Sequence, residues 1–286
     1  MKKVFLMLTA VVLSGLIFYG CTYNSGSFLN PLDNVENRVS KLTELSAEDV
    51  FGTGNVPAAG STYKILVVTD VHFGSIRPGA PDIPLQKVYD YIDNNPDIKF
   101  CICLGDAIDY GSEEIMASYN DFVRTIEQEK HIKVINTVGN HDLYQSGWEI
   151  WKKNCYPNTS FYKFETDGFS FYGLDTGSGT LGVKQLTLFE EALQKDPKPK
   201  LIFTHYPLFT NKFCVGLDDP TERAYFYRLC QKNNVKMAIT GHAHKKETTD
   251  FGEFNAYILP SLRFNGGFTV VEINESTGTA TKKYKK

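Results

Sequence analysis

The sequence has no excess of basic residues and few cysteines, and these two absences exclude several classes of protein. Lys and Arg total 30 against 33 Asp and Glu, so the chain lacks the basic footprint of a nucleic-acid-binding protein. It has six cysteines but no C-x-x-C pair, which argues against a zinc site built from thiolates. Internal repeats and low-complexity tracts are also absent. The ordinary composition predicts a globular protein.

The first 20 residues resemble the signal peptide of a bacterial lipoprotein. Two lysines follow Met1, the apolar stretch from Val4 to Tyr19 is too short for a membrane-spanning helix, and a glycine precedes Cys21. This pattern predicts lipidation of Cys21, and hence an exported, membrane-anchored lipoprotein that faces the periplasm or the cell surface. An uncleaved anchor and ordinary secretion are the alternatives, and both also place the domain outside the cytoplasm.

Residues 21–60 are expected to form a tether with one amphipathic helix packed on a single domain over residues 61–286. A helix that binds a partner is the alternative. Both ends of the tether are polar, and between them apolar residues recur at the spacings of three and four that mark one helix face. These residues are Leu32, Val35, Val39, Leu42 and Leu45. At the other end of the chain, residues 282–286 are expected to be a short charged tail.

From residue 63 onward, short apolar runs alternate with helical patterns. The runs, which are typical of strands buried on both faces of a sheet, lie at residues 65–69, 100–104, 134–138, 201–204 and 235–240. The helical patterns cover Pro84–Asn94, Ile115–Glu129, Lys184–Lys195 and Glu222–Lys232. A hairpin is expected at Asp167-Gly168. Together these features predict an α/β fold, a four-layer αββα sandwich with two mixed sheets packed face to face and helices outside.

Residues of the types that commonly bind metals follow each of the five apolar runs. Because open α/β sheets carry their sites at the carboxyl ends of strands, these side chains are expected to meet at one edge. They are Asp70, His72, Asp106, Asn140, His205, His242 and His244. Such oxygen and imidazole ligands suit Mn, Fe, Zn, Mg or Co, and a shared carboxylate holds two cations about 3.5–4 Å apart. The sequence thus predicts a site for two metal ions, with His141 left over for proton transfer.

The order of these residues resembles the calcineurin-like metallophosphoesterase superfamily over roughly residues 63–273. The motifs are Asp70-x-His72, Gly105-Asp106-x-x-Asp109, Gly139-Asn140-His141-Asp142, His205 and Gly241-His242-x-His244. Tyr110 and Asp142 occupy positions where phosphoprotein phosphatases carry Arg and Glu. The match is therefore closer to exported members that are similar to cyclic nucleotide phosphodiesterases, although Tyr206 stands where those often have a second histidine.

The resemblance implies a role for each residue. The implied ligands are Asp70, His72 and His244 for the first metal, Asn140, His205 and His242 for the second, and Asp106 between them. A hydroxide that bridges the metals is implied as the attacking group. His141 is implied to protonate the leaving alkoxide or to steady the transferring phosphoryl group, and Asp109 to orient this histidine. Asp142 is the alternative orienting acid, or a cap of the helix that follows.

Simpler structural roles also exist for some of these residues. Asp106 and Asn140 follow glycines, as turn-forming residues do, and Asp109 also fits a helix cap or a turn. Their combination with four histidines favours ligands over turns. His131 lies outside every motif and is expected to be structural or on the surface.

Substrate contacts are the least determined part of the site. Arg77 is a candidate phosphate clamp, because a guanidinium contacts two oxygens at once, and a solvated loop residue is the alternative. Tyr110 and Tyr206 are aromatic candidates for contact with the substrate, or else members of a loop core.

These features predict a phosphoester hydrolase with a dinuclear metal centre, acting on a small or medium phosphomonoester or phosphodiester. Two alternatives stay open. A nuclease needs a basic groove for the nucleic-acid backbone, and this acidic chain has no evident one, so nucleic acid is an unexpected partner. A non-catalytic metal-binding scaffold of the same fold is disfavoured because all seven ligand positions and His141 are present.

Overall fold

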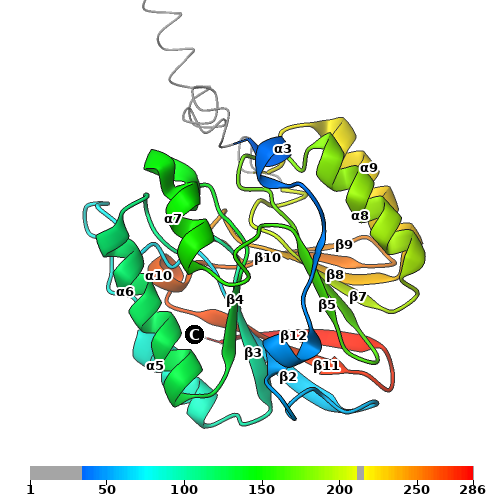
Figure 1. The fold of residues 1–286 in the computed structure, drawn as a ribbon, viewed down its shortest axis with the longest axis horizontal. Coiled ribbons are helices and arrows are strands. Elements are labelled where there is room, and N and C mark those ends of the chain that lie inside the picture. The colour runs from blue at the N-terminus through cyan, green and yellow to red at the C-terminus, as the bar shows by residue number, and fades with distance from the viewer. Residues whose placement is uncertain (1–33, 211–215, 286) are drawn as a thin grey trace, which may run out of the picture.

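The computed structural model describes residues 34–210 and 216–285 of the chain. Two sheets pack face to face, and helices cover both outer faces (Figure 1). This is the four-layer αββα sandwich that the alternation of strands and helices predicts. The predicted signal peptide and Cys21 lie outside the described residues. Among the described residues, no helix combines the length and the apolar character needed to cross a membrane.

The larger sheet has seven strands in the order β1-β5-β6-β7-β8-β10-β9. Its strands are β1 (Thr43–Glu44), β5 (Tyr162–Glu165), β6 (Ser170–Gly173), β7 (Lys200–Phe203), β8 (Val235–Thr240), β9 (Glu247–Asp250) and β10 (Asn255–Ile258). Neighbouring strands are parallel except in the pairs β5–β6 and β9–β10. The antiparallel pairing of β5 with β6 confirms the predicted hairpin at Asp167-Gly168.

The smaller sheet has five strands in the order β12-β11-β2-β3-β4. Its strands are β2 (Thr62–Val68), β3 (Ile98–Cys103), β4 (Lys133–Asn136), β11 (Phe268–Asn274) and β12 (Thr279–Lys285). The strands β2, β3 and β4 are parallel to one another, whereas β11 is antiparallel to both of its neighbours. Both sheets are therefore mixed, as predicted.

The helices fall into two outer layers and a few short turns. Beside the smaller sheet lie α5 (Leu85–Asp93), α6 (Glu113–Arg124) with its π-helical continuation η2 (Thr125–Glu129), and α7 (Gly147–Asn154). Beside the larger sheet lie α8 (Val183–Lys195) and α9 (Pro220–Lys232). The shorter turns are α3 (Val35–Arg38), α4 (Ala47–Phe51), η3 (His141–Ser146) and α10 (Leu262–Asn265).

Strand β2 shows why its sequence is apolar at successive positions. Alternate side chains of a strand point to opposite faces, and both faces of β2 are covered. Ile65 and Val67 pack in the cluster between the two sheets, whereas Leu66 and Val68 pack in the cluster beneath α5, α6 and α7. A run buried on both faces thus ends at the polar residue Asp70, which is where the site begins.

Residues 34–60 pack against the rest of the domain, and they form two short helices and a strand where the sequence predicted one amphipathic helix packed on the domain. The segment forms two short helices, α3 and α4, separated by β1, which pairs in parallel with β5. Val35 and Val39 pack beside the larger sheet, and Val50 and Phe51 pack between the sheets. Because these side chains serve two different cores and β1 joins a sheet, tertiary contacts override the local helical spacing.

Lys282, Lys283 and Lys285 belong to a strand, whereas the sequence predicted a short charged tail over residues 282–286. Strand β12 pairs with β11 in antiparallel register from Thr279 to Lys285 and forms the edge of the smaller sheet. Lysines on an edge strand discourage pairing with another chain. Charge in this segment is therefore consistent with an exposed sheet edge.

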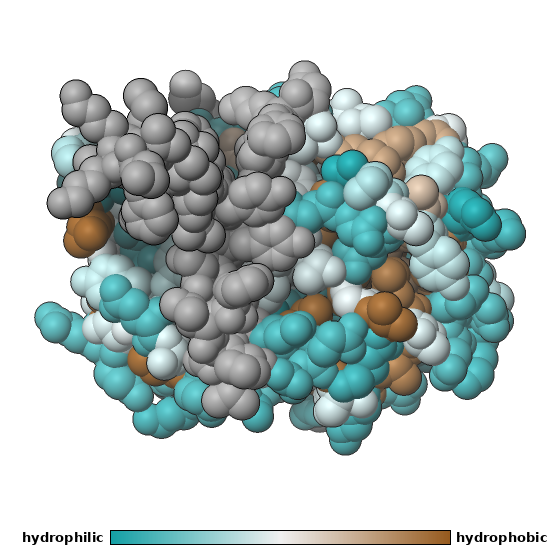
Figure 2. Space-filling model, turned by 90° about the horizontal axis from the view of Figure 1, so that it is seen from above, coloured by the Kyte–Doolittle hydropathy of each residue, from teal (hydrophilic) through white to brown (hydrophobic). Residues whose placement is uncertain are grey.

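The described surface carries few large apolar side chains. Those exposed are Ile76, Val183 and Tyr225. Figure 2 shows that the face seen from above is mostly hydrophilic outside the grey atoms, with hydrophobic side chains in limited areas.

Candidate metal centre

All seven predicted ligands lie at one edge of the sandwich, just beyond the carboxyl ends of five strands. Three of those strands, β2, β3 and β4, belong to the smaller sheet, and two, β7 and β8, belong to the larger one. The loops carry Asp70 and His72 after β2, Asp106 after β3, Asn140 after β4, His205 after β7, and His242 and His244 after β8. The site thus forms where the two sheets meet.

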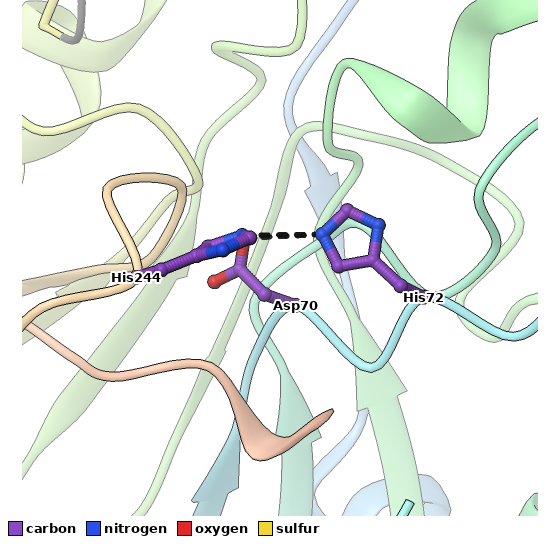
Figure 3. A group of neighbouring side chains, drawn as sticks. All are labelled: Asp70, His72 and His244. Carbon is purple, nitrogen blue, oxygen red and sulfur yellow. Dashed lines mark hydrogen bonds and ion pairs between the residues drawn. The ribbon is translucent and has the colours of Figure 1, made fainter. Parts of the chain in front are cut away.

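Asp70, His72 and His244 form what we call the first ligand cluster. The Nε2 atom of His244 lies 3.0 Å from Oδ1 of Asp70 and 3.2 Å from Nε2 of His72. Figure 3 shows the three side chains pointing toward one another, His72 from the side opposite His244. Ligand atoms that converge in this way offer a cation one carboxylate oxygen and two imidazole nitrogens.

Asn140, His205 and His242 form the second ligand cluster, and Asp106 lies beside it. The Nε2 atom of His205 lies 3.2 Å from Oδ1 of Asn140 and 3.3 Å from Oδ2 of Asp106. The ring of His242 lies 5.1 Å from that of His205, and the Asp106, His205 and His242 ligand atoms all lie within 4.8 Å of one another. This cluster again combines oxygen with imidazole nitrogen.

The carboxylate of Asp106 faces both clusters. Its Oδ2 atom lies 3.3 Å from Nε2 of His205 and 3.7 Å from Nε2 of His72. Its Oδ1 atom accepts a hydrogen bond of 2.9 Å from the backbone N–H of His141. Gly139 allows this close approach, because a Cβ there would meet the backbone nitrogen and Oδ1 of Asp106. Asp106 therefore stands where a carboxylate shared by two cations is expected.

The backbone of this site is strained. Five of the seven predicted ligands have a left-handed conformation with φ between 49° and 62°, namely Asp70, His72, Asp106, His242 and His244. For a residue with a Cβ this conformation costs roughly 1–2 kcal/mol. Such strain concentrates at functional sites, where surrounding contacts hold it. In both Asp70-x-His72 and His242-x-His244, one residue separates the two ligands. Both side chains of each pair therefore point toward the site.

Electrostatics keep both carboxylates ionised. Burial opposes ionisation of Asp70, but the hydrogen bond and charge of His244 lower its pKa to about 2. Burial also opposes ionisation of Asp106, whose pKa the charge of His205 holds well below its usual range. For His205, burial favours the neutral form, yet Asp106 raises its pKa to about 9. Burial lowers the pKa of His242 to about 3, and His205 adds to this effect. The histidines thus compensate the negative charge of the two carboxylates.

Asp109 contacts two histidines, and the shorter contact of its side chain is with His72, a predicted metal ligand. Its Oδ1 atom lies 2.9 Å from Nδ1 of His72 and 3.4 Å from Nδ1 of His141. The Nδ1 atom of His141 lies closer, at 2.8 Å, to the backbone carbonyl oxygen of Asp109. The structure thus brings Asp109 to His141, as the resemblance implies, but it directs the carboxylate mainly to His72. The Nε2 atom of His72 remains directed to the first cluster.

Asp142 is buried and joins two loops of the site. Its Oδ1 atom accepts a hydrogen bond of 3.1 Å from the backbone N–H of Ile108, and Oδ2 accepts one of 2.8 Å from Gly139. Burial and the charge of Asp106 raise its pKa to about 7. Its carboxylate therefore ties the loop after β3 to the loop after β4, a different contact from the helix cap or the orientation of His141 expected as alternatives.

Two of the predicted substrate contacts, Arg77 and Tyr206, lie beside the ligand clusters. The Arg77 guanidinium lies over the ring of Phe264, 4.9 Å from its centre, and that ring stacks on His244 at 5.2 Å. Tyr206 stacks on His242 with ring centres 3.9 Å apart, and Tyr110 is half-buried directly after Asp109. Sequence motifs gave no signal for Phe264, which reaches the site from α10. His131 is exposed at the opposite end of β4, as expected.

Comparison with known proteins supports the same family that the motifs resemble. A sequence model of the calcineurin-like phosphoesterase family matches residues 63–246. A protein of Fibrobacter succinogenes named a probable cyclic nucleotide phosphodiesterase is 25% identical over 208 residues, which cover 70% of this chain and 80% of that protein. Another of that name from Colwellia psychrerythraea is 27% identical over 175 residues, 56% of this chain and 61% of that protein.

A solved structure shows the same fold. The dimetal phosphatase from Danio rerio superposes with a TM-score of 0.60 over 75% of this chain and 93% of that protein, at 13% sequence identity. An identity this low carries information on the fold alone. The αββα sandwich is therefore shared with a phosphatase whose sequence is very different.

Proposed function

Because this chain belongs to the calcineurin-like phosphoesterase family, we propose that it is a phosphoester hydrolase with a dinuclear metal centre. One observation carries the proposal. Two clusters of oxygen and imidazole ligands flank a single buried carboxylate, that of Asp106, which faces a histidine of each cluster. Two cations that share a carboxylate are the arrangement used to hydrolyse phosphoesters in two-metal sites.

The residues present fit two such ions. The first would be held by Asp70, His72 and His244, the second by Asn140, His205 and His242, with Asp106 between them. The ligand set contains no thiolate, which suits Mn, Fe, Zn, Mg or Co. When bound, the ions would supply a water of lowered pKa and neutralise charge on the phosphoryl group.

His141 is proposed to donate a proton to the leaving group. Its side chain is 18% exposed, whereas the side chains of His72 and His205 are fully buried. The contact between its Nδ1 atom and the backbone carbonyl of Asp109 makes Nδ1 the donor there, so the proton given to the leaving group would come from Nε2 of the imidazolium form, which becomes a neutral imidazole. A partly exposed imidazole beside two ligand clusters is placed to reach a bound substrate.

The proposed substrate is a phosphomonoester or phosphodiester of small or medium size. Arg77 is proposed to contact its phosphate oxygens, because the stack of Arg77 on Phe264 and of Phe264 on His244 holds the guanidinium beside the first cluster. Tyr206, stacked on His242, is the corresponding aromatic candidate beside the second cluster, and Tyr110 is a third candidate. The names of the two curated relatives make a cyclic phosphodiester the first diester to assay.

We also propose that the protein is exported and held at a membrane by lipid on Cys21. The proposal rests on the sequence pattern before that cysteine. Cys21→Ser in the full chain is expected to move the protein from the membrane fraction to the soluble fraction. Recovery of the variant in the membrane fraction would favour an uncleaved anchor instead.

The experiment that tests the hydrolase uses metal-stripped protein and adds Mn, Fe, Zn, Mg and Co singly. A chromogenic phosphomonoester, the matching diester and a single-stranded oligonucleotide are offered in parallel. Metal-restored hydrolysis of either small ester supports the proposal, and preferential hydrolysis of the oligonucleotide supports a nuclease instead. Folded protein that binds two metals and hydrolyses none of the three contradicts the proposal and favours a binding scaffold.

A further inference from the structure

Tyr144 contacts the side chain of one proposed ligand from outside both clusters. The Nδ2 atom of Asn140 donates a hydrogen bond of 2.8 Å to the hydroxyl oxygen of Tyr144. The other end of the same carboxamide, Oδ1, lies 3.2 Å from Nε2 of His205. Only the oxygen end of a carboxamide has lone pairs for a cation. The contact with Tyr144 therefore anchors the nitrogen end of the carboxamide, and the oxygen end faces the second ligand cluster.

The chain holds Tyr144 in place with a strained backbone. The two residues that follow it, Gln145 and Ser146, are both left-handed, with φ of 54° and 62°. Residues with a Cβ rarely adopt this conformation. The carbonyl oxygen of Tyr144 accepts a hydrogen bond of 2.9 Å from the backbone N–H of Gly111, and a Cβ on Gly111 would lie 2.7 Å from that oxygen. Such strain persists where several contacts over-determine the conformation, and this one fixes Tyr144.

The surroundings of the hydroxyl keep it suited to this contact. Within residues 34–210 and 216–285, the carboxamide of Asn140 is its one hydrogen-bond partner. The Tyr144 ring also lies 4.7 Å from that of His141. The side chain is therefore packed between a proposed ligand and the proposed proton donor.

We propose that Tyr144 is a positioning residue, which turns the carboxamide of Asn140 so that its oxygen binds the second metal ion. This inference rests on the proposed two-metal function and extends it to a residue outside the motifs. Partners that orient metal ligands in this way commonly change metal affinity 10–100-fold when they are removed. The effect should appear in metal binding itself, before any substrate is added.

The test is a double-mutant cycle on metal-stripped protein, with Mn²⁺ as the probe and calorimetry as the readout. Tyr144→Phe removes only the hydroxyl, and the second Mn²⁺ is expected to bind about 10–100-fold more weakly while the first binds as before. In an Asn140→Asp background both ends of the side chain are oxygens. There, Tyr144→Phe is expected to change the second affinity by less than about twofold.

Tyr225→Phe is the matched control. It removes a hydroxyl of α9 that contacts the exposed side chain of Glu190 on α8, and it should leave both affinities unchanged. The inference is overturned if Tyr144→Phe leaves the second affinity unaltered, if it weakens that affinity equally in both backgrounds, or if the wild type binds one Mn²⁺ only. Wild-type protein that binds two Mn²⁺ but hydrolyses no phosphoester contradicts the proposed function alone, because this test needs no substrate.

Discussion

The Nδ1 atom of His72 lies 2.9 Å from Oδ1 of Asp109. This contact fixes the orientation of the imidazole and leaves its Nε2 atom directed to the first ligand cluster. The same aspartate contacts His141 mainly through its backbone carbonyl oxygen. One residue thus supports a proposed ligand with its side chain and the proposed proton donor with its main chain, and substitution separates the two roles.

Asp109→Asn is expected to weaken binding of the first metal about 10–100-fold, because the carboxamide replaces the carboxylate that orients His72. The backbone carbonyl that contacts His141 remains in the variant. Calorimetric titration of metal-stripped protein measures the effect, and Asp121→Asn, at an exposed aspartate on α6, serves as the control. Unchanged metal affinity together with lost activity would show that the carboxylate acts through His141 instead.

His141→Asn is expected to lower kcat for phosphoester hydrolysis by about 10²–10⁴ while both metals are retained, because it removes a proton donor and no ligand. Steady-state kinetics and metal analysis of the same preparation measure both effects. His131→Asn is the matched control, since His131 is an exposed histidine away from the site. Activity equal to that of the wild type would refute the role of His141.

The clusters show what the sequence could predict. The five motifs stand at the ends of apolar runs, and buried parallel strands bring such ends to one edge, so the meeting of Asp70 with His244 followed from local patterns. Other features depend on tertiary packing, so local patterns could not predict them. They are the left-handed backbone of these residues, the contact of the Asp109 carboxylate with His72, and the position of Phe264 on α10 beside the site. The path of residues 34–60 depends on tertiary packing too, because β1 forms only where β5 offers an edge.

Arg38→Met is expected to lower the free energy of unfolding by about 3–5 kcal/mol, because it leaves the buried carboxylate of Asp175 without its cationic partner. The two side chains are fully buried and joined by hydrogen bonds of 2.7 and 2.8 Å. Urea unfolding measures the loss. Arg124→Met, which breaks an exposed ion pair with Asp121, should cost no more than about 1 kcal/mol. Equal losses would show that the buried pair does not hold the N-terminal segment.

Asp196→Asn is expected to lower stability at neutral pH, and the deficit should shrink below about pH 4. Burial opposes ionisation of Asp196, but the Tyr172 hydroxyl at 2.8 Å and the charges of Lys200 and Lys163 lower its pKa below the ordinary value. A carboxyl with a lowered pKa in the folded state stabilises that state above its unfolded pKa. Its contribution is lost as the pH falls through the folded pKa. Urea unfolding of both proteins from pH 3 to 7 checks this, and a deficit that is constant across the range would contradict it.

The most direct test of the central claim is a titration of hydrolytic activity against metal equivalents. Metal-stripped protein receives increasing amounts of the metal that restores the highest activity, and bound metal is counted at each point. We expect hydrolysis to reach its plateau at two metal ions per chain, because Asp106 stands between two ligand clusters. A plateau at one metal ion per chain, with no second ion bound, would contradict the dinuclear centre.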